Sequence, residues 1–414
     1  MTQQPLLHQR SAWIPALKIH IGGPQRLAAL LLLVFLGECL WVISRQQVTS
    51  EDYRFARCGR EMWERPSPLA GYFTTCGNLH GDGVAAYRLA SLPLTLQRLI
   101  LLTGDRFRKP QDRLYSEGSL NGSTWEARHE ISAVKYLMHV PFCLFAMWLG
   151  GGLWWVSRRL FGNEGGALAL ALYCFSPEIV RFSVRPNNEV LAMWGLYGVV
   201  YTAMGVAHAL QGPPRRWKPR ILLLIVALGL TSAAHLLAVM AGFVLSVVLM
   251  FYLAERRRSA VLLIATYAAL GALVIDFAFF SFRLQPFSYV FTGGAARFWF
   301  TFSGARELLL SQGNWPTLAA AVIALAMYAG VRRSRYFGNT APLLVFLSIV
   351  FLMTTQTISA PWLWALPFLF TFLGGVFADL LETRQRRLFL AFSSLLVLTQ
   401  ALVCLSSLSA LVRG

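Results

Sequence analysis

Long apolar runs dominate this sequence and restrict it to folds that a lipid bilayer can hold. Runs of about 15 to 25 mostly apolar residues recur along the chain, and a helix needs about 20 such residues to cross the ~30 Å hydrocarbon core. With 56% hydrophobic residues and a mean hydropathy of +0.54, the 414-residue chain is too apolar for a soluble globule. The runs therefore predict an all-α polytopic membrane protein.

Eleven membrane spans are expected. They cover residues 27–44, 132–156, 165–180, 190–210, 221–234, 236–254, 259–282, 315–331, 341–356, 361–380 and 388–411. The first span follows the polar, basic segment 1–26 and lacks a convincing small-residue cleavage site, so we expect a signal anchor. The apolar stretch 221–254 would be roughly 50 Å long as one helix, well over the membrane thickness. We therefore expect two helices that turn at TSAAH (231–235).

The distribution of charge predicts the orientation. The formal net charge is +18, but the basic residues stand in small groups between apolar runs, a pattern that sets membrane topology and argues against nucleic-acid binding. With eleven spans, one side of the membrane receives loops that hold 15 Lys and Arg, namely 157–159, 213–220, 255–258, 331–335 and 382–387. The short opposite loops hold 5. The N-terminus is thus expected to be cytoplasmic and the polar segment 45–133 external.

This first external segment has enough polar groups to build a site. It begins with TSEDYRFARCGREMW (49–63), which places Glu51 and Asp52 just beyond the first span. Within it, residues 84–102 have apolar residues at near-helical spacing but are too polar to span. We expect that stretch to lie along the membrane surface as a helix.

The same segment contains Cys58 and Cys76, the only cysteines of the external polar region. The chain between them is short enough to close readily, so we predict a disulfide if this side is oxidising. The remaining cysteines lie in apolar runs and are expected to be small core residues; they are Cys39, Cys143, Cys174 and Cys404.

A second external segment, 283–314, contains the aromatic stretch RFWFTF (297–302), in which Arg297 is followed by Phe298, Trp299 and Phe300. Such a stretch is either an interfacial anchor or a lid over a lipid carrier, and the sequence leaves both open.

Few ionisable residues lie inside the spans, and the usual motifs of soluble enzymes are absent. Glu38 and Asp276 fall in the outer halves of their expected helices, which fits either a cavity open to the outside or a structural carboxylate. The sequence has no P-loop, HExxH, CxxC or GxGxxG motif. It also lacks a series of acidic groups across the membrane and a pair of broken helices, which makes a secondary transporter the weaker interpretation.

Three stretches resemble the GT-C glycosyltransferases, especially bacterial members related to protein O-mannosyltransferases and aminoarabinose transferase. They are WWVSRRLFGNEGGALALALYCFSPEIVRFSVRPNNEVLAMW (154–194), EDYRFARCG (51–59) and LHGDGVAAYRLASLPL (79–94). The resemblance covers about 27–210 and makes that part a GT-C-like module, with 211–414 as a C-terminal transmembrane bundle. In this chain the acidic pair is reversed, Phe55 replaces a frequent histidine, and two prolines expected near position 84 are missing.

The resemblance implies a sugar transfer from a polyprenyl-phosphate donor to an acceptor hydroxyl on the external face, with inversion. The acceptor is a protein, lipid or glycan, and the setting is the bacterial inner membrane. In this scheme Glu51 is the base, and Asp52 assists it or binds a divalent cation such as Mg²⁺ or Mn²⁺. Residues expected to bind phosphate or substrate are Arg54, Arg57, Arg88, Arg185, Asn188, Glu189 and Arg297, while His80 and Asp82 are candidates for acceptor or metal binding.

Two other functional classes remain open at this stage. The chain is alternatively a non-catalytic GT-C-fold subunit or scaffold, or a transporter or flippase of lipid-linked material. The environment of Glu51 and Asp52 separates the first of these from an enzyme, whereas a transporter needs a pathway that reaches the cytoplasmic face.

Overall fold

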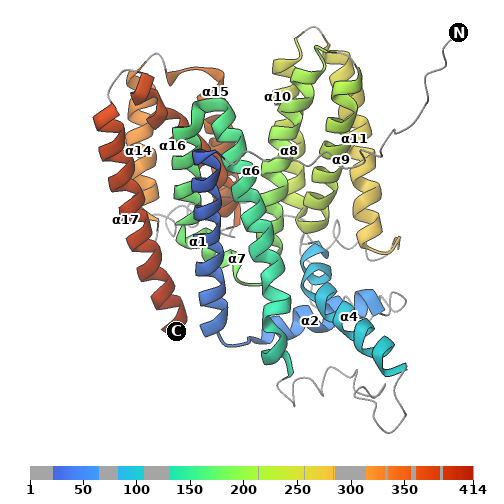
Figure 1. Ribbon diagram of the computed structural model, residues 1–414. Coiled ribbons are helices and arrows are strands. Elements are labelled where there is room, and N and C mark those ends of the chain that lie inside the picture. Colours follow the sequence, from blue (N-terminus) through green and yellow to red (C-terminus); the bar gives the residue numbers. More distant parts are fainter. Residues whose placement is uncertain are drawn as a thin grey trace, which may run out of the picture.

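The computed structural model describes residues 22–64, 83–106, 130–212, 214–255, 257–282, 284, 314–331, 334–355, 360–382 and 386–413, which form a bundle of helices without a strand (Figure 1). The helices are α1 (Gly23–Arg45), α2 (Ser50–Glu64), α4 (Ala85–Arg106), α6 (Glu130–Cys174), α7 (Pro177–Ser183), α8 (Asn188–Ala209), α9 (Pro214–Ala234), α10 (Leu236–Leu253), α11 (Arg258–Phe279), α14 (Trp315–Gly330), α15 (Phe337–Thr355), α16 (Ala360–Glu382) and α17 (Arg386–Arg413). The all-α polytopic prediction is confirmed.

A helix occupies every expected span. Eight helices of the described chain are long and apolar enough to cross a membrane, and α14 and α15 are shorter apolar helices. α6 alone contains two expected spans, because Gly162 adopts φ 82° and breaks the helical path. Glycine has no Cβ and takes this conformation without the strain that another residue would bear.

The two limbs of α6 run back along each other. Tyr173, near the end of the second limb, donates its hydroxyl to the carbonyl of Ala146 in the first, across 2.6 Å. The span expected at 165–180 is shorter than predicted, since α6 ends at Cys174 and α7 begins at Pro177 after a break at Ser176. Proline has no N–H and disfavours a helical conformation in the residue before it, which accounts for the break.

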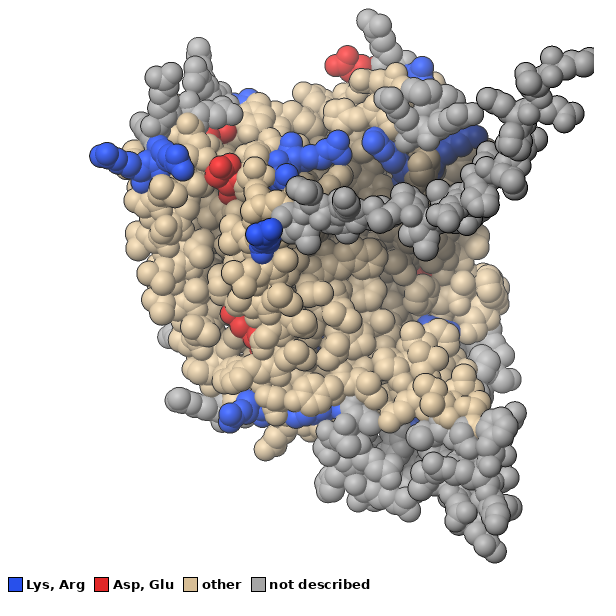
Figure 2. Space-filling model, in the orientation of Figure 1, with Lys and Arg blue, Asp and Glu red and all other residues tan. Residues whose placement is uncertain are grey.

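The division of 221–254 into two helices is confirmed. α9 ends at Ala234, His235 is extended with φ −155° and ψ 122°, and α10 begins at Leu236. With two helices, residues 221–254 cross the membrane twice, as is required to keep the later basic loops on the same side as the earlier ones. In the face drawn in Figure 2, Lys and Arg side chains gather along the upper edge, and a smaller group lies along the lower edge.

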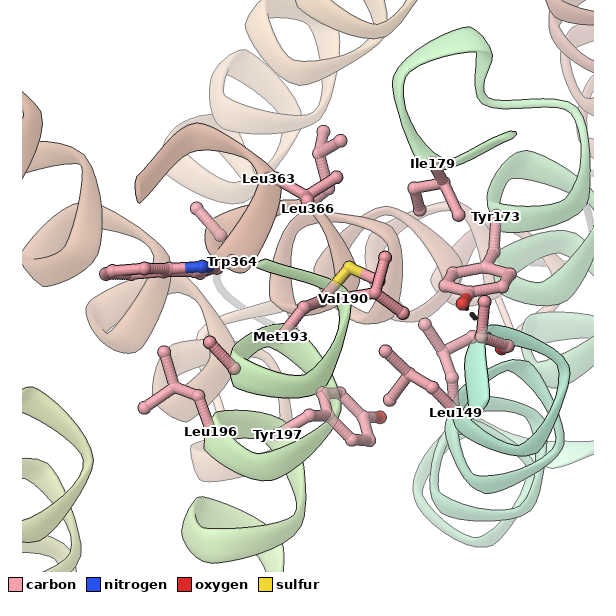
Figure 3. Close-up of a cluster of buried hydrophobic side chains, with 14 of the residues drawn as sticks. Leu149, Tyr173, Ile179, Val190, Met193, Leu196, Tyr197, Leu363, Trp364 and Leu366 are labelled. Atoms are coloured by element: carbon pink, nitrogen blue, oxygen red, sulfur yellow. Dashed lines mark hydrogen bonds between the residues drawn. The ribbon is translucent and has the colours of Figure 1, made fainter. Parts of the chain in front are cut away.

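The core is built around α16. In the most apolar stretch of α16, 94% of the residues are buried within the protein. In the corresponding stretch of α17, on the edge of the bundle, 17% are buried. Figure 3 shows side chains from α6, α7, α8 and α16 that meet in this core, among them Tyr173, Ile179, Met193 and Trp364. α16 therefore packs against helices of the N-terminal half and links the two halves of the chain.

α2 and α4 lie across the lower end of the bundle (Figure 1). They pack closely on each other: the rings of Phe55 and Tyr87 stack with centroids 4.5 Å apart. A Cβ on Gly59 would stand only 2.1 Å from the carbonyl oxygen of Tyr87, so only glycine permits this contact. The surface orientation of 84–102 stays a prediction, and the second half of α4 exposes the apolar residues Leu96, Leu99 and Ile100 that it would require.

Candidate active site

The first turn of α2 carries the acidic pair and is fixed by a capping box. Thr49 precedes the helix and Asp52 is its third residue. The backbone N–H and the hydroxyl of Thr49 donate to Asp52 Oδ2 at 2.8 and 2.9 Å, and the backbone N–H of Asp52 lies 3.4 Å from the Thr49 hydroxyl oxygen. Two N–H groups that lack helical partners are thereby satisfied.

The second carboxylate oxygen of Asp52 is paired with a histidine from another helix. His139 of α6 places Nε2 3.1 Å from Asp52 Oδ1, and both side chains are almost fully buried. The other ring nitrogen, Nδ1, lies 2.7 Å from the carbonyl oxygen of Val184. Burial alone raises the pKa of Asp52, but the His139 pair and the Thr49 hydrogen bonds together hold that pKa below its ordinary value.

Glu51 has a different environment from its neighbour. Its side chain is 68% exposed and forms an ion pair with Arg54, one turn further along α2, at 3.5 Å. An exposed pair of this kind contributes little to stability and opens readily. Glu51 is thus accessible to a substrate, whereas both oxygens of Asp52 are held by contacts within the protein.

Arg88 is buried at the start of α4 and contacts two distant helices. Its Nε donates to the carbonyl of Phe279 at 2.6 Å and its Nη2 to the hydroxyl of Ser281 at 2.7 Å, both at the end of α11. The guanidinium also stacks over the Trp63 ring, 4.9 Å from its centroid, and Trp63 donates its indole N–H to the carbonyl of Arg88. The contacts of Arg88 tie α2, α4 and α11 together.

The turn between α7 and α8 forms a second polar region. Asn187 caps α8 by accepting from the N–H of Val190 at 2.9 Å. Asn188 is buried and uses both ends of its amide on the segment before α4: it accepts from Ala86 N–H at 3.1 Å and donates to the carbonyl of Gly83 at 3.0 Å. Asn188 therefore joins α8 to α4, while Arg185 in the same turn is exposed.

Glu189, the next residue of α8, contacts the central helix. It accepts from the indole N–H of Trp364 at 2.8 Å. The ring of His235, at the turn between α9 and α10, packs edge-on against Trp364 with centroids 4.8 Å apart. The N-terminal ends of α8, α10 and α16 thus meet through polar and aromatic side chains.

Several predicted site residues lie outside the described residues: Cys76, His80, Asp82 and Arg297, the last together with the aromatic stretch 297–302. Cys58 is disulfide-bonded, whereas Cys39, Cys143, Cys174 and Cys404 are free thiols. The pairing of Cys58 with Cys76 stays a prediction. Arg54 and Arg57 lie on exposed positions of α2.

The described part of this region presents no cluster of ligands for a divalent cation. Mg²⁺ takes six oxygen ligands, commonly one or two protein carboxylates together with waters and substrate phosphate. Asp52 is committed to Thr49 and His139, and Glu51 stands apart from it. In the chain that the structure describes, no group of three His, Cys, Asp or Glu side chains is placed to hold a metal. We therefore assign no step of the chemistry to a metal.

The fold and this polar region define a class: a multi-pass membrane protein of the GT-C glycosyltransferase fold, with α2 and α4 packed across one end of the bundle. Solved structures confirm that fold. ArnT from Cupriavidus metallidurans, bound to undecaprenyl phosphate, superposes with a TM-score of 0.56 at 14% identity over 86% of this chain and 60% of that one. The Archaeoglobus fulgidus oligosaccharyltransferase, in complex with zinc and sulfate, gives a TM-score of 0.55 at 11% identity over 92% of this chain and 53% of that one.

This chain thus spans little more than half the length of each of those proteins. No family model matches the sequence, and no curated protein matches it significantly. At such identities the likeness establishes the fold, and the activity has to be argued from the site.

Three contact residues were not identified from the sequence. His139 stands in an apolar run and Val184 contributes only its backbone, so neither carries a local signal of its role. Trp364 resembles any aromatic residue of a buried span. The buried role of Asp52, by contrast, has a local signal. A Thr followed three residues later by an acidic residue, as Thr49 is by Asp52, is typical of a capping box and predicts a structural role for that carboxylate.

Proposed function

We propose that this chain is an inverting membrane glycosyltransferase that moves a sugar from a polyprenyl-phosphate donor to an acceptor hydroxyl on the outer face of a bacterial inner membrane. The observation that carries the proposal is the exposed carboxylate of Glu51, held on a capped helix at one end of a GT-C fold. The shared fold with ArnT, solved with undecaprenyl phosphate, supports a lipid-linked donor.

In the proposed reaction Glu51 takes the proton of the acceptor hydroxyl as that oxygen bonds to the anomeric carbon of the donor sugar. The bond from this carbon to the phosphate oxygen breaks, and polyprenyl phosphate leaves with the bonding electron pair. Attack opposite the leaving group inverts the anomeric centre. Arg54 and Arg185, both exposed on the site side, are the proposed partners of the departing phosphate.

The test uses purified protein in proteoliposomes with a panel of polyprenyl-phosphate sugars and acceptors. Wild-type protein transfers sugar with at least one donor, and Glu51→Gln abolishes most of that transfer. Glu164→Gln is a matched control, because Glu164 is exposed beyond the bend at Gly162, in a loop expected on the cytoplasmic side. Equal loss in both variants, or none in either, contradicts the assignment of Glu51.

A non-catalytic GT-C-fold subunit is the second candidate, and one observation favours it. Asp52 and Arg88, which the resemblance assigns to chemistry and phosphate binding, both make buried contacts within the protein. Absence of transfer by wild-type protein with every donor of the panel is the outcome expected of such a subunit.

A further inference from the structure

The first helix of the outer region is held by α6 at two points. Lys135 donates from Nζ to the carbonyl oxygens of Ser44 and Gln46, at 3.2 and 3.3 Å, where the chain leaves α1. One turn further along α6, His139 contacts Asp52 at 3.1 Å, at the start of α2. Residues four apart share one helix face. One contact fixes a point, and two fix the direction of the segment between α1 and α2.

The imidazole of His139 also reaches a third segment. A carbonyl oxygen only accepts hydrogen bonds, so Nδ1 donates its proton to Val184 across 2.7 Å. The other ring nitrogen, Nε2, faces Asp52 Oδ1 at 3.1 Å, so the ring lies between two oxygen atoms from two segments. Val184 immediately precedes Arg185, so one buried ring joins the acidic pair of α2 to the turn that carries this arginine.

We propose that His139 is a positioning residue that sets the distance between Glu51 and Arg185. The proton-accepting carboxylate lies next to Asp52 in sequence, and the proposed phosphate partner lies next to Val184, so each end of the imidazole bridge stands one residue from a candidate functional group. The effect of His139 on catalysis rests on the proposed function. The two contacts of its ring do not, and they are tested without measuring activity.

An apolar side chain at this position on α6 supplies neither contact. Phenylalanine fills the same volume but leaves Asp52 Oδ1 and the Val184 carbonyl buried without a donor, which is costly for both groups. Glutamine is of similar reach and supplies one amide nitrogen, so it retains one contact and loses the other. His139→Phe therefore removes the bridge, and His139→Gln leaves half of it.

Distances measured by pulsed electron paramagnetic resonance test the bridge directly. Nitroxide labels go on Arg54→Cys and Arg185→Cys, both exposed, and the unsubstituted protein gives the labelling background from its buried thiols. The expected distribution is narrow with native His139, broader with Gln and broadest with Phe. The control His208→Gln changes an exposed histidine at the other end of α8 and leaves the distribution narrow.

A narrow, unshifted distribution in His139→Phe overturns the bridge, and so does equal broadening in His208→Gln. If His139→Phe does not yield folded protein, His139→Gln carries the test, because its retained contact preserves the fold while the distribution still widens.

The kinetic arm tests positioning. Misplacement by about 1 Å costs up to about a hundredfold in rate, so kcat of His139→Gln falls by about 10- to 100-fold while the KM for donor changes by less than about twofold. A broad distance distribution with unchanged kcat overturns the positioning role. The outcomes remain separable from those of the function, because loss of the bridge is seen even in a protein without transferase activity, and Glu51→Gln tests the chemistry with the bridge intact.

Discussion

Arg88 and Phe279 stand 191 residues apart in the sequence and are joined by a 2.6 Å hydrogen bond from the guanidinium Nε to the carbonyl oxygen. Beyond this carbonyl, Ser281 and Phe282 have φ values of 54° and 56°, in the left-handed region that costs a non-glycine residue roughly 1–2 kcal/mol. Arg88 also holds the hydroxyl of Ser281. The arginine that the sequence suggests as a phosphate ligand therefore stabilises the strained end of α11.

We predict that Arg88→Lys destabilises the protein and has a smaller effect on donor binding. Lysine keeps the charge but lacks the planar fork that reaches Phe279 and Ser281 together, so at least one charge-assisted hydrogen bond, worth about 1.5–3 kcal/mol, is lost. Thermal unfolding in detergent and donor titration give the two quantities. Arg258→Lys, at the exposed start of α11, is the control. A large loss of donor affinity with unchanged unfolding would return Arg88 to the role of phosphate ligand.

The buried pair of Asp52 and His139 gives a prediction about coupling. His139→Phe leaves the buried Asp52 carboxylate without this partner and lowers the unfolding free energy by about 3–5 kcal/mol, whereas Asp52→Ala leaves His139 Nε2 buried without an acceptor, at about 1–3 kcal/mol. The double variant loses less than the sum of the two, because the second substitution removes the group that the first left without a partner. Denaturant unfolding of the four proteins measures this. Additive losses would show that the two side chains do not interact.

The lowered pKa of Asp52 predicts the acid sensitivity of α2. A carboxyl whose folded-state pKa lies below its unfolded value of about 4 contributes stability at pH above that value and loses it as the pH falls toward the folded-state pKa. Unfolding of wild-type protein should therefore become easier below about pH 4. Asp52→Asn carries no such proton and should show a flatter profile over the same range. Parallel profiles for the two proteins would argue against this linkage.

The bundle was predictable because each span is a local signal. Length and apolarity identify a span within its own 20 or so residues, and the count is checked by charges that lie between spans. The break at His235 was expected on these grounds and is present. The bend at Gly162 was foreseen only as a loop, and the early end of α6 before Pro177 was missed, since helix ends depend on one or two residues.

The site was less predictable because its contacts join distant segments. Glu51 and Asp52 are adjacent and chemically alike, yet one is exposed and the other buried. The difference arises from His139, some 87 residues further on, whose partner cannot be read from the apolar run around it. Asn188 was foreseen as a site residue, but its amide holds the backbone before α4. Sequence identified which residues are polar, and packing decided which of them remain accessible.

The bridge between Cys58 and Cys76 is a further prediction. Cys58 is disulfide-bonded, and the other described cysteines are free and buried. Peptide mapping without reduction should recover one cross-linked peptide that contains both residues. The double variant Cys58→Ser, Cys76→Ser should unfold more easily by about 2–4 kcal/mol, since the loop in the unfolded chain is no longer closed. A peptide that links Cys58 to any other residue contradicts the pairing.

The final prediction concerns Glu51. In Glu51→Gln the side chain keeps its shape but loses the proton-accepting carboxylate, so transfer should fall by the ~10²–10⁴ typical of general-base loss while donor binding is largely retained.

The reciprocal swap, Glu51→Asp with Asp52→Glu, restores the order found in the proteins that the sequence resembles. Glutamate at position 52 still suits a capping box with Thr49, but its longer side chain alters the contact with His139. Activity of the swap should thus lie between wild type and Glu51→Gln. Both are measured with the donor panel in proteoliposomes, beside Glu164→Gln; full activity of Glu51→Gln would exclude Glu51 as the base.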